Sequence, residues 1–342
     1  MKIVAGTDKG LVVFERTTTV WEIKKIHFLG YPVGAICLED SKWWVGINHK
    51  HWGPKIHVSE DQGKSWTELN TPKFGADMNF ALRSIWSINY QNDTLLIGTE
   101  PAGLFASDDG GHHYREITGL HHHPSRHEWM GGGKGSNNPF LHTTLIDHSE
   151  AKHWMVGISC AGIFRSLDNG ATWNPSNTGM ESFYPSKSDV GYDPHCIKQS
   201  LSNPDVFWQQ NHCGVYRSTD RGKTWSDVSP PESKYGFALG LSANDPLEAW
   251  IIPAESDDLR IPSGGILTVL HTTDGGVSWM AQTNGLPKTQ SFDLVFRDAF
   301  DLNGNQLSFG TNNGNLYFSA NKGQDWDLIN VHLSPIRSLR IR

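Results

Sequence analysis

The sequence has little charge, few cysteines and no long hydrophobic run. Only 19% of its 342 residues are charged, and the formal net charge of −7 supplies no basic stripe of the kind that binds nucleic acid. No apolar stretch is long enough to span a membrane or to act as a signal peptide. The four cysteines, Cys37, Cys160, Cys196 and Cys213, are not closely paired, which favours free thiols. We therefore expect a cytoplasmic protein with neither a nucleic-acid nor a membrane partner.

What the sequence has instead is a repeat rich in glycine and tryptophan. Its 35 Gly and 14 Trp accompany six copies of an eight-residue pattern, at 59–66, 107–114, 166–173, 218–225, 272–279 and 319–326. Each copy begins with Ser or Thr, has Asp or Asn third and Gly fifth, and ends on Trp or Tyr. In such a turn the hydroxyl and carboxylate accept backbone N–H bonds, Gly permits a positive φ and the ring packs inward. The pattern predicts a structural hairpin turn, so its acidic residues are not catalytic candidates.

Short apolar strands ending in Gly recur between these turns, as in 95–98 and 154–157. Together with the turns they make seven units, each a four-stranded antiparallel sheet with the turn between its third and fourth strands. The chain starts on a second strand at 3–7, and 335–341 is a first strand with no second strand after it. We therefore predict an all-β fold: a seven-bladed β-propeller, one domain over residues 1–342, whose C-terminal strand completes the first blade.

Polar side chains recur at matched positions in three successive units. Twelve residues before the equivalent strand positions Leu95, Trp154 and Phe207 stand Arg83, His142 and His195, and five residues after them stand Glu100, Ser159 and His212. In an up-and-down blade the start of the first strand and the end of the second share one face, near the axis. The longest connecting loops lie on the same face, where function is usually carried.

Two chemistries fit these side chains, and a third interpretation assigns them no function. His142, His195, His212 and Glu100 could form the ligand shell of zinc or a similar divalent metal. Alternatively, Glu100 and His142 could act as general acid and base while Arg83 holds an anionic group. In the third interpretation the same side chains line a water-filled channel and satisfy one another.

Loops at this face supply further candidates for ligand binding. The His-rich segment 119–135 carries Arg126 and Trp129, and its glycines could hinge it as a lid. Trp129 and Tyr184 could stack on a sugar or another flat ligand, and Arg260 belongs to the sixth unit. The two aromatic side chains could equally pack under their own loops.

The six turns resemble the Asp-box, or BNR, repeat S-x-D-x-G-x-[ST]-W of sialidases, sortilin-type receptors, oligoxyloglucan hydrolases and photosystem II assembly factors. Over the full length, the runs 123–126, 141–143 and 209–218 look like a bacterial group of single-propeller proteins labelled glycosyl hydrolases. The first resemblance implies a propeller. The second implies a hydrolase of glycosidase type, although the Arg-Ile-Pro of sialidases stands in the sixth unit here, at 260–262.

The sequence leaves two classes of function open. The first is an enzyme or small-ligand binder, glycosyl hydrolase-like or metal-assisted, that acts on a polar or carbohydrate ligand at the propeller mouth. The second is a non-catalytic scaffold for protein interactions. Convergence of the polar side chains favours the first, and a large exposed apolar patch favours the second.

Overall fold

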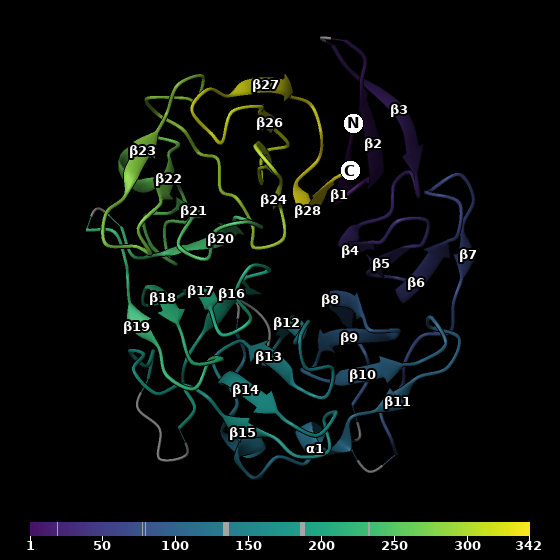
Figure 1. Ribbon diagram of the computed structural model, residues 1–342. Coiled ribbons are helices and arrows are strands. Elements are labelled where there is room, and N and C mark those ends of the chain that lie inside the picture. Colours follow the sequence, from purple (N-terminus) through teal and green to yellow (C-terminus); the bar gives the residue numbers. More distant parts are fainter. Residues whose placement is uncertain (19, 77, 79, 133–136, 185–188, 232) are drawn as a thin grey trace. The chain divides into compact units, whose positions relative to one another are not determined.

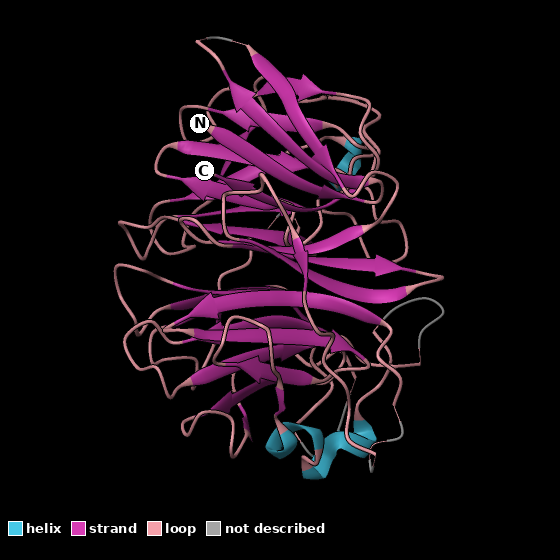
Figure 2. Cartoon of the chain, turned by 90° about the vertical axis from the view of Figure 1, so that its right-hand side faces the viewer, coloured by secondary structure: helices cyan, strands magenta, loops and turns pink. Residues whose placement is uncertain are grey.

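Nearly all regular structure in the chain is β-strand (Figure 2). The computed structural model describes residues 1–342 except 19, 77, 79, 133–136, 185–188 and 232. Residue contacts divide the chain into two compact units, which are described separately: residues 1–33, 196–219 and 226–342, and residues 34–195 and 220–225. Within the described ranges, no helix is both long and apolar enough to cross a membrane.

The unit built around residues 34–195 contains three four-stranded antiparallel sheets. The first consists of β4 (Val33–Leu38), β5 (Trp43–His49), β6 (Gly53–Ser59) and β7 (Thr67–Glu68). The second consists of β8 (Ser84–Gln91), β9 (Thr94–Glu100), β10 (Leu104–Ser107) and β11 (Arg115–Glu116). The third consists of β12 (Leu141–Ile146), β13 (Trp154–Ile158), β14 (Gly162–Ser166) and β15 (Asn174–Pro175). The His-rich segment forms α1 (Thr118–His121) and the 3-10 helix η1 (Pro124–Glu128); the part of its predicted hinge at 133–136 lies outside the described residues.

The other unit contains the first blade, which both ends of the chain build (Figure 1). Its strands are β28 (Ile336–Ile341), β1 (Lys2–Thr7), β2 (Gly10–Arg16) and β3 (Trp21–His27). β28 pairs antiparallel with β1, from Ile3 opposite Ile341 to Thr7 opposite Ile336. This pairing confirms the prediction that the C-terminal strand completes the first blade.

Three further sheets follow the same order along the chain. The first consists of β16 (Pro194–Gln199), β17 (Phe207–Asn211), β18 (Val215–Ser218) and β19 (Ser226–Asp227), and the division between the two units passes within β16. The second consists of β20 (Gly236–Leu241), β21 (Ala249–Pro253), β22 (Val269–Thr272) and β23 (Met280–Gln282), with the 3-10 helix η2 (Ser263–Gly265) between β21 and β22. The third consists of β24 (Phe300–Asn303), β25 (Gln306–Gly310), β26 (Leu316–Ser319) and β27 (Asp327–Asn330). The fold is a seven-bladed β-propeller, as the repeat predicts.

Several central strands are buried along their whole length. Every residue of β13, β17 and β21 is buried, so both faces of these strands pack against protein. The outermost strands of four sheets, such as β7, have only two residues each, which limits the exposed sheet edge. β3, the outermost strand of the first blade, differs, because it has seven residues and an exposed centre. The first blade is also the blade that lacks the repeated turn.

The repeated turn closes on itself through hydrogen bonds. In the third copy, Ser166 Oγ accepts the N–H of Gly170 at 2.8 Å and donates to Asp168. Asp168 in turn accepts from the backbone and hydroxyl of Thr172 at 2.9 and 2.7 Å, and these bonds lower its pKa. Gly170 takes a φ of 82°, which a side chain would disfavour. The acidic residue therefore holds a turn, as expected.

Candidate functional site

Inner strands of several sheets contain a β-bulge near their starts. The pairing skips one residue in each of four inner strands: Trp86 in β8, His142 in β12, Phe237 in β20 and Arg337 in β28. A bulge changes the direction of one side chain and is common beside functional sites. These four residues therefore occupy equivalent positions in their four sheets.

The counterpart of His142 in the preceding sheet is Trp86 and not Arg83. Ser87, just after the bulge in β8, pairs with Gly98, and Thr143, just after the bulge in β12, pairs with Gly157. The chain from the bulge to this glycine is three residues shorter in the sheet of β8 than in the sheet of β12. A fixed interval counted back from the second strand therefore ends at Arg83, before the bulge at Trp86. Arg83 is exposed and donates its backbone N–H to the carbonyl oxygen of Glu100 at 2.8 Å.

Trp86 and His142 belong to one aromatic group. Trp86 stacks on Phe140, with ring centroids 4.5 Å apart and planes at 12°, and its centroid lies 5.3 Å from that of His142. The Glu100 carboxylate accepts a hydrogen bond from Ser84 Oγ at 3.0 Å and lies 3.5 Å from Trp86 Nε1. The predicted acid, Glu100, thus lies against the same tryptophan that His142 contacts.

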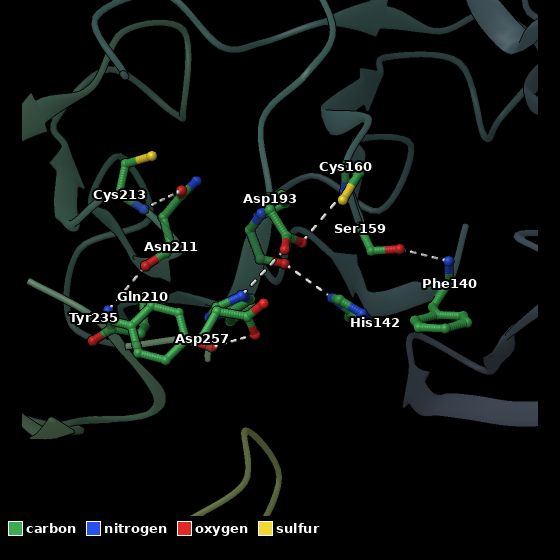
Figure 3. A network of polar contacts seen from close by, with 12 residues as sticks. Phe140, His142, Ser159, Cys160, Asp193, Gln210, Asn211, Cys213, Tyr235 and Asp257 are labelled. Carbon is green, nitrogen blue, oxygen red and sulfur yellow. Dashed lines mark hydrogen bonds and ion pairs between the residues drawn. The ribbon is translucent and has the colours of Figure 1, made fainter. Parts of the chain in front are cut away.

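The position of His142 is fixed by the segment that leads into β16. Its Nδ1 donates to the carbonyl oxygen of Pro194 at 3.1 Å, a bond that places the proton of the neutral ring on Nδ1. Ser159 Oγ accepts the backbone N–H of Phe140 at 2.7 Å, beside His142 in the sequence (Figure 3). His142 is therefore a rigidly placed, buried imidazole.

Three potential metal ligands converge on the sheet of β16–β19. Asp193, His195 and His212 each offer one ligand atom, and these atoms all lie within 4.8 Å of one another. Asp193 precedes β16, His195 lies in β16 and His212 lies in the turn after β17. Asp193 and His195 are buried, with Asp193 Oδ2 3.3 Å from His195 Nε2.

Backbone contacts orient this group. The other oxygen of Asp193, Oδ1, accepts the N–H of Cys160 at 3.3 Å (Figure 3). Asn211 Oδ1 accepts the N–H of Cys213 at 3.1 Å and shapes the turn that carries His212. The ligand atoms are thus held by the ends of two neighbouring strands, a rigid support for a site.

Comparisons with known proteins identify the repeat. The model of the BNR-Asp box repeat matches residues 215–228. The chain is a β-propeller that carries a BNR-Asp box repeat, and it is called a BNR-type propeller below in that sense.

Solved structures similar to this BNR-type propeller share its fold at low sequence identity. The GH74 enzyme of Niastella koreensis has a TM-score of 0.62 at 15% identity; the match covers 99% of this chain and 51% of that enzyme, so this chain spans about half of the enzyme's length. YCF48 bound to D1 peptide has a TM-score of 0.55 at 13% identity, covering 89% of this chain and 84% of that one. A functionally unknown protein from Desulfotomaculum acetoxidans has a TM-score of 0.58 at 10% identity, with 99% and 98% covered. None of the curated proteins compared with the chain matches it.

Two of the four metal ligands expected from the sequence lie close together in the structure. His195 and His212 join the convergent group, with Asp193 in addition. Among the described residues, the group does not include His142 or Glu100, because His142 bonds to the backbone at Pro194 and Glu100 lies against Ser84 and Trp86. A donor set for a metal exists in the propeller, and it is built from one sheet.

Two of the four candidates for ligand binding, Trp129 and Tyr184, are held by hydrogen bonds within the protein. Trp129 is buried, donates from Nε1 to Ser125 Oγ at 3.0 Å and packs on Phe164. The Tyr184 hydroxyl donates to the carbonyl oxygen of Cys160 at 2.6 Å, and burial raises its pKa to about 12. Both rings therefore stabilise the loops that carry them.

The other two candidates, Arg126 and Arg260, lie over aromatic rings. The guanidinium of Arg126 is 4.7 Å from the ring centroid of Trp129 and 5.5 Å from that of Phe80. Burial lowers the pKa of Arg126 to about 10, which still leaves it charged at neutral pH. Arg260 pairs with Asp257 and lies over Phe237, at 5.6 Å from the ring centroid.

Asp257 is the centre of a polar cluster beside His212. It accepts a hydrogen bond from the Tyr235 hydroxyl at 3.0 Å (Figure 3), and it is also paired with Arg260. Burial opposes ionisation of Asp257, but the bonds from Arg260 and Tyr235 and the nearby His212 outweigh it, so the pKa of Asp257 is lowered. The Tyr235 ring meets that of His212 edge to face.

Sequence reasoning missed Asp193, Trp86 and Arg337. For Asp193 a signal was present, because alternate residues of an extended segment point to the same side and Asp193 is two residues before His195. Trp86 and Arg337 depend on bulges, which shift the register without a sequence mark that we can identify.

Proposed function

We propose that the BNR-type propeller binds a divalent metal ion through Asp193, His195 and His212 and uses it to hold and polarise a small polar ligand. The observation that carries the proposal is the convergence of the three ligand atoms. Two imidazoles and one carboxylate are a donor set of catalytic zinc sites and suit other borderline divalent metals as well. Three protein ligands leave coordination positions open for a ligand.

The geometry of the three residues fits such an ion. Ligand atoms around tetrahedral zinc lie about 3.4 Å apart, given metal–ligand distances of about 2.0–2.1 Å. Asp193 and His195 already have this separation, at 3.3 Å. The contact with the Cys160 N–H orients the carboxylate from outside, as outer contacts do in metal sites.

The reaction class that we propose is hydrolysis of a polar, carbohydrate-like ligand. A bound metal of this kind supplies Lewis-acid polarisation and an activated water. Glu100 and His142 supply acid and base groups on the neighbouring sheets, and half-exposed Trp86 supplies a flat apolar surface beside them. The fold likeness to a GH74 enzyme is compatible with this class of substrate.

Metal content of the untagged protein tests the proposal. We expect one metal ion per chain by elemental mass spectrometry after equilibration with zinc or manganese. His195→Ala and His212→Ala should each lose it, whereas His332→Ala, which changes an exposed histidine, should retain it. A folded wild-type protein that takes up no metal would overturn the proposal.

A non-catalytic interaction scaffold is the second candidate function. It is favoured by the outer strand β3, where Ile23 and Ile26 are each 43% exposed and Val20, just before the strand, is 56% exposed. Exposed apolar residues on a sheet edge are a feature of surfaces that bind other chains. If the wild-type protein holds no metal, this candidate becomes the better one.

A further inference from the structure

Arg126 is a charged side chain that lies over two aromatic rings in the unit built around residues 34–195. Its guanidinium carbon is 4.7 Å from the ring centroid of Trp129 and 5.5 Å from that of Phe80. Among the residues that the structure describes, none accepts a hydrogen bond from this guanidinium, and its Nη1 is closed to solvent without a partner. We propose that Arg126 binds the carboxylate of a small molecule that has an apolar body.

The missing acceptor is the observation that calls for a ligand. Buried polar groups are nearly always hydrogen-bonded and buried charges are paired, because leaving either without a partner costs free energy. A guanidinium carries five N–H donors. Burial lowers the pKa of Arg126 to about 10, so the group is still charged at neutral pH. Within the described residues, Arg126 is therefore a charged donor group whose acceptor must come from elsewhere.

Two acidic side chains close in the sequence pair with histidines instead. Glu116 bonds His121 Nδ1 through Oε1 and accepts the Gly75 N–H through Oε2 at 2.7 Å. Glu128 Oε1 lies 3.8 Å from Nε2 of His127. Arg126 acts on His121 through its charge, which helps to lower the pKa of that ring. Neither carboxylate forms an ion pair with Arg126.

The aromatic rings hold the guanidinium in place before a ligand arrives. Trp129 is 7% exposed, donates from Nε1 to Ser125 Oγ and packs on Phe164. Phe80, from the segment between β7 and β8, meets Phe74 edge to face with ring centroids 5.7 Å apart. Cation–π contacts with these rings use none of the N–H donors of the guanidinium. The donors therefore stay available on a side chain that is already ordered.

The shape of the guanidinium and the exposure of Phe80 indicate the class of ligand. A planar guanidinium matches a carboxylate, which accepts two parallel N–H bonds from it. Arg126 is partly exposed and Phe80 is 40% exposed, so a solute can approach both side chains. A carboxylate at Arg126 would place the rest of its molecule beside the exposed part of the Phe80 ring. An apolar or aromatic body fits that position.

The carboxylate site goes beyond the proposed function and does not require the metal. Hydrogen bonds connect the two within one unit. The Tyr184 hydroxyl lies 3.2 Å from the carbonyl oxygen of Glu128, at the end of η1, and donates to that of Cys160, whose N–H bonds Asp193. Carboxylate binding can be measured in chelator-treated protein, so the two proposals can fail separately.

Saturation-transfer NMR titrations of chelator-treated protein test the site, in a buffer free of phosphate and other carboxylates. Sodium benzoate and sodium acetate are the two probes. We expect saturable binding of benzoate and weaker binding of acetate, which lacks the apolar body. Arg126→Gln should weaken benzoate binding about tenfold or more, because one hydrogen bond to a charged group is worth about that factor. Arg126→Lys, which keeps the charge but loses the planar fork, should lose less.

Phe80→Ala tests the apolar body of the ligand. The change removes a partly exposed ring and should weaken benzoate binding more than acetate binding. An equal loss for the two probes would show that the ring does not contact the ligand, and would overturn that part of the proposal.

Arg115→Gln is the matched control, because Arg115 also lies over a ring in the same unit, 5.4 Å from the centroid of Trp154, but is paired with Asp108. It should leave the benzoate affinity unchanged, and circular dichroism should show every variant folded. No saturable binding of benzoate at tens of millimolar would overturn the proposal, as would an equal loss in Arg115→Gln, which would reflect net charge alone. Binding that appears only in Asp77→Asn, a change outside the described residues, would also overturn it, because a carboxylate of the chain would then occupy Arg126. Benzoate binding without metal uptake would leave this site standing and the metal proposal refuted.

Discussion

His212 and Tyr235 meet edge to face, with ring centroids 5.2 Å apart and planes at 81°. His212 belongs to the convergent metal ligands, and Tyr235 donates to Asp257, which pairs with Arg260. A substitution of His212 therefore disturbs two groups at once. Asp193 has no part in the Tyr235 contact, and its substitution is the cleaner test of metal binding.

Asp193→Asn should weaken metal binding by more than about 100-fold. The change removes the charge of a direct ligand but keeps its size, and outer-shell changes alone cost about 10–100-fold. His142 is a buried neighbour of the metal ligands and donates to the Pro194 carbonyl oxygen. His142→Gln should therefore weaken metal binding by no more than about 10–100-fold. Competition with a chromophoric chelator measures both affinities. Exposed Asp40→Asn serves as the charge control, and equal affinities in Asp193→Asn and Asp40→Asn would contradict the assignment.

His121 should make the protein lose stability between pH 6.5 and 4. Its Nε2 accepts the Leu104 N–H at 2.8 Å and its Nδ1 is bonded to Glu116, so the buried ring is neutral. Burial, more than the opposing effect of Glu116, lowers its pKa to about 4. Because the folded pKa lies below the unfolded value, the contribution is complete above pH 6.5 and disappears as pH falls through 4.

The free energy of unfolding should fall progressively over this range, because the unfolded state takes up the proton of His121 at a higher pH than the folded state does. Urea unfolding at pH 7, 6, 5 and 4.5 measures it, and His121→Gln should flatten the curve over this range. Arg126 and His122 also face the ring electrostatically, so the comparison needs the same salt throughout. An identical pH dependence in wild type and variant would show that His121 is not the group responsible.

Ser166→Ala should destabilise the fold by about 1–3 kcal/mol. The buried hydroxyl accepts the Gly170 N–H, and its removal leaves that donor without its partner in a turn closed to water. Thr172→Ala changes an exposed residue of the same turn and should cost less. Chemical denaturation compares the two, and a smaller loss for Ser166→Ala than for Thr172→Ala would refute the structural role of the hydroxyl.

The fold could be predicted from the sequence because its signals are local. The hydrogen bonds that close each turn, as between Ser166 and Gly170, join residues no more than four positions apart, so a short pattern contains the whole device. The strand order followed from the repeat, including the strand at 335–341.

The site could be predicted only in part because it depends on register. His195 and His212 were found since both follow the common spacing, but Trp86 was missed because its sheet has a shorter connection after the bulge. Arg337 was missed as well, and its guanidinium lies over Phe296, in the segment that precedes β24. Contacts between sheets leave no fixed interval in the chain.

Leu339→Ala should lower the free energy of unfolding by about 2–5 kcal/mol. The same change on an exposed outer strand should cost less. Leu339 is fully buried in β28 opposite Ala5, so the substitution opens a cavity where the two ends of the chain pair. Leu328→Ala, in the outer strand β27 and 48% exposed, is the matched control and should be nearly neutral. Thermal and urea unfolding measure both. Because only β28 supplies the first blade with its inner strand, a small effect of Leu339→Ala would mean that closure by the C-terminus contributes little to stability.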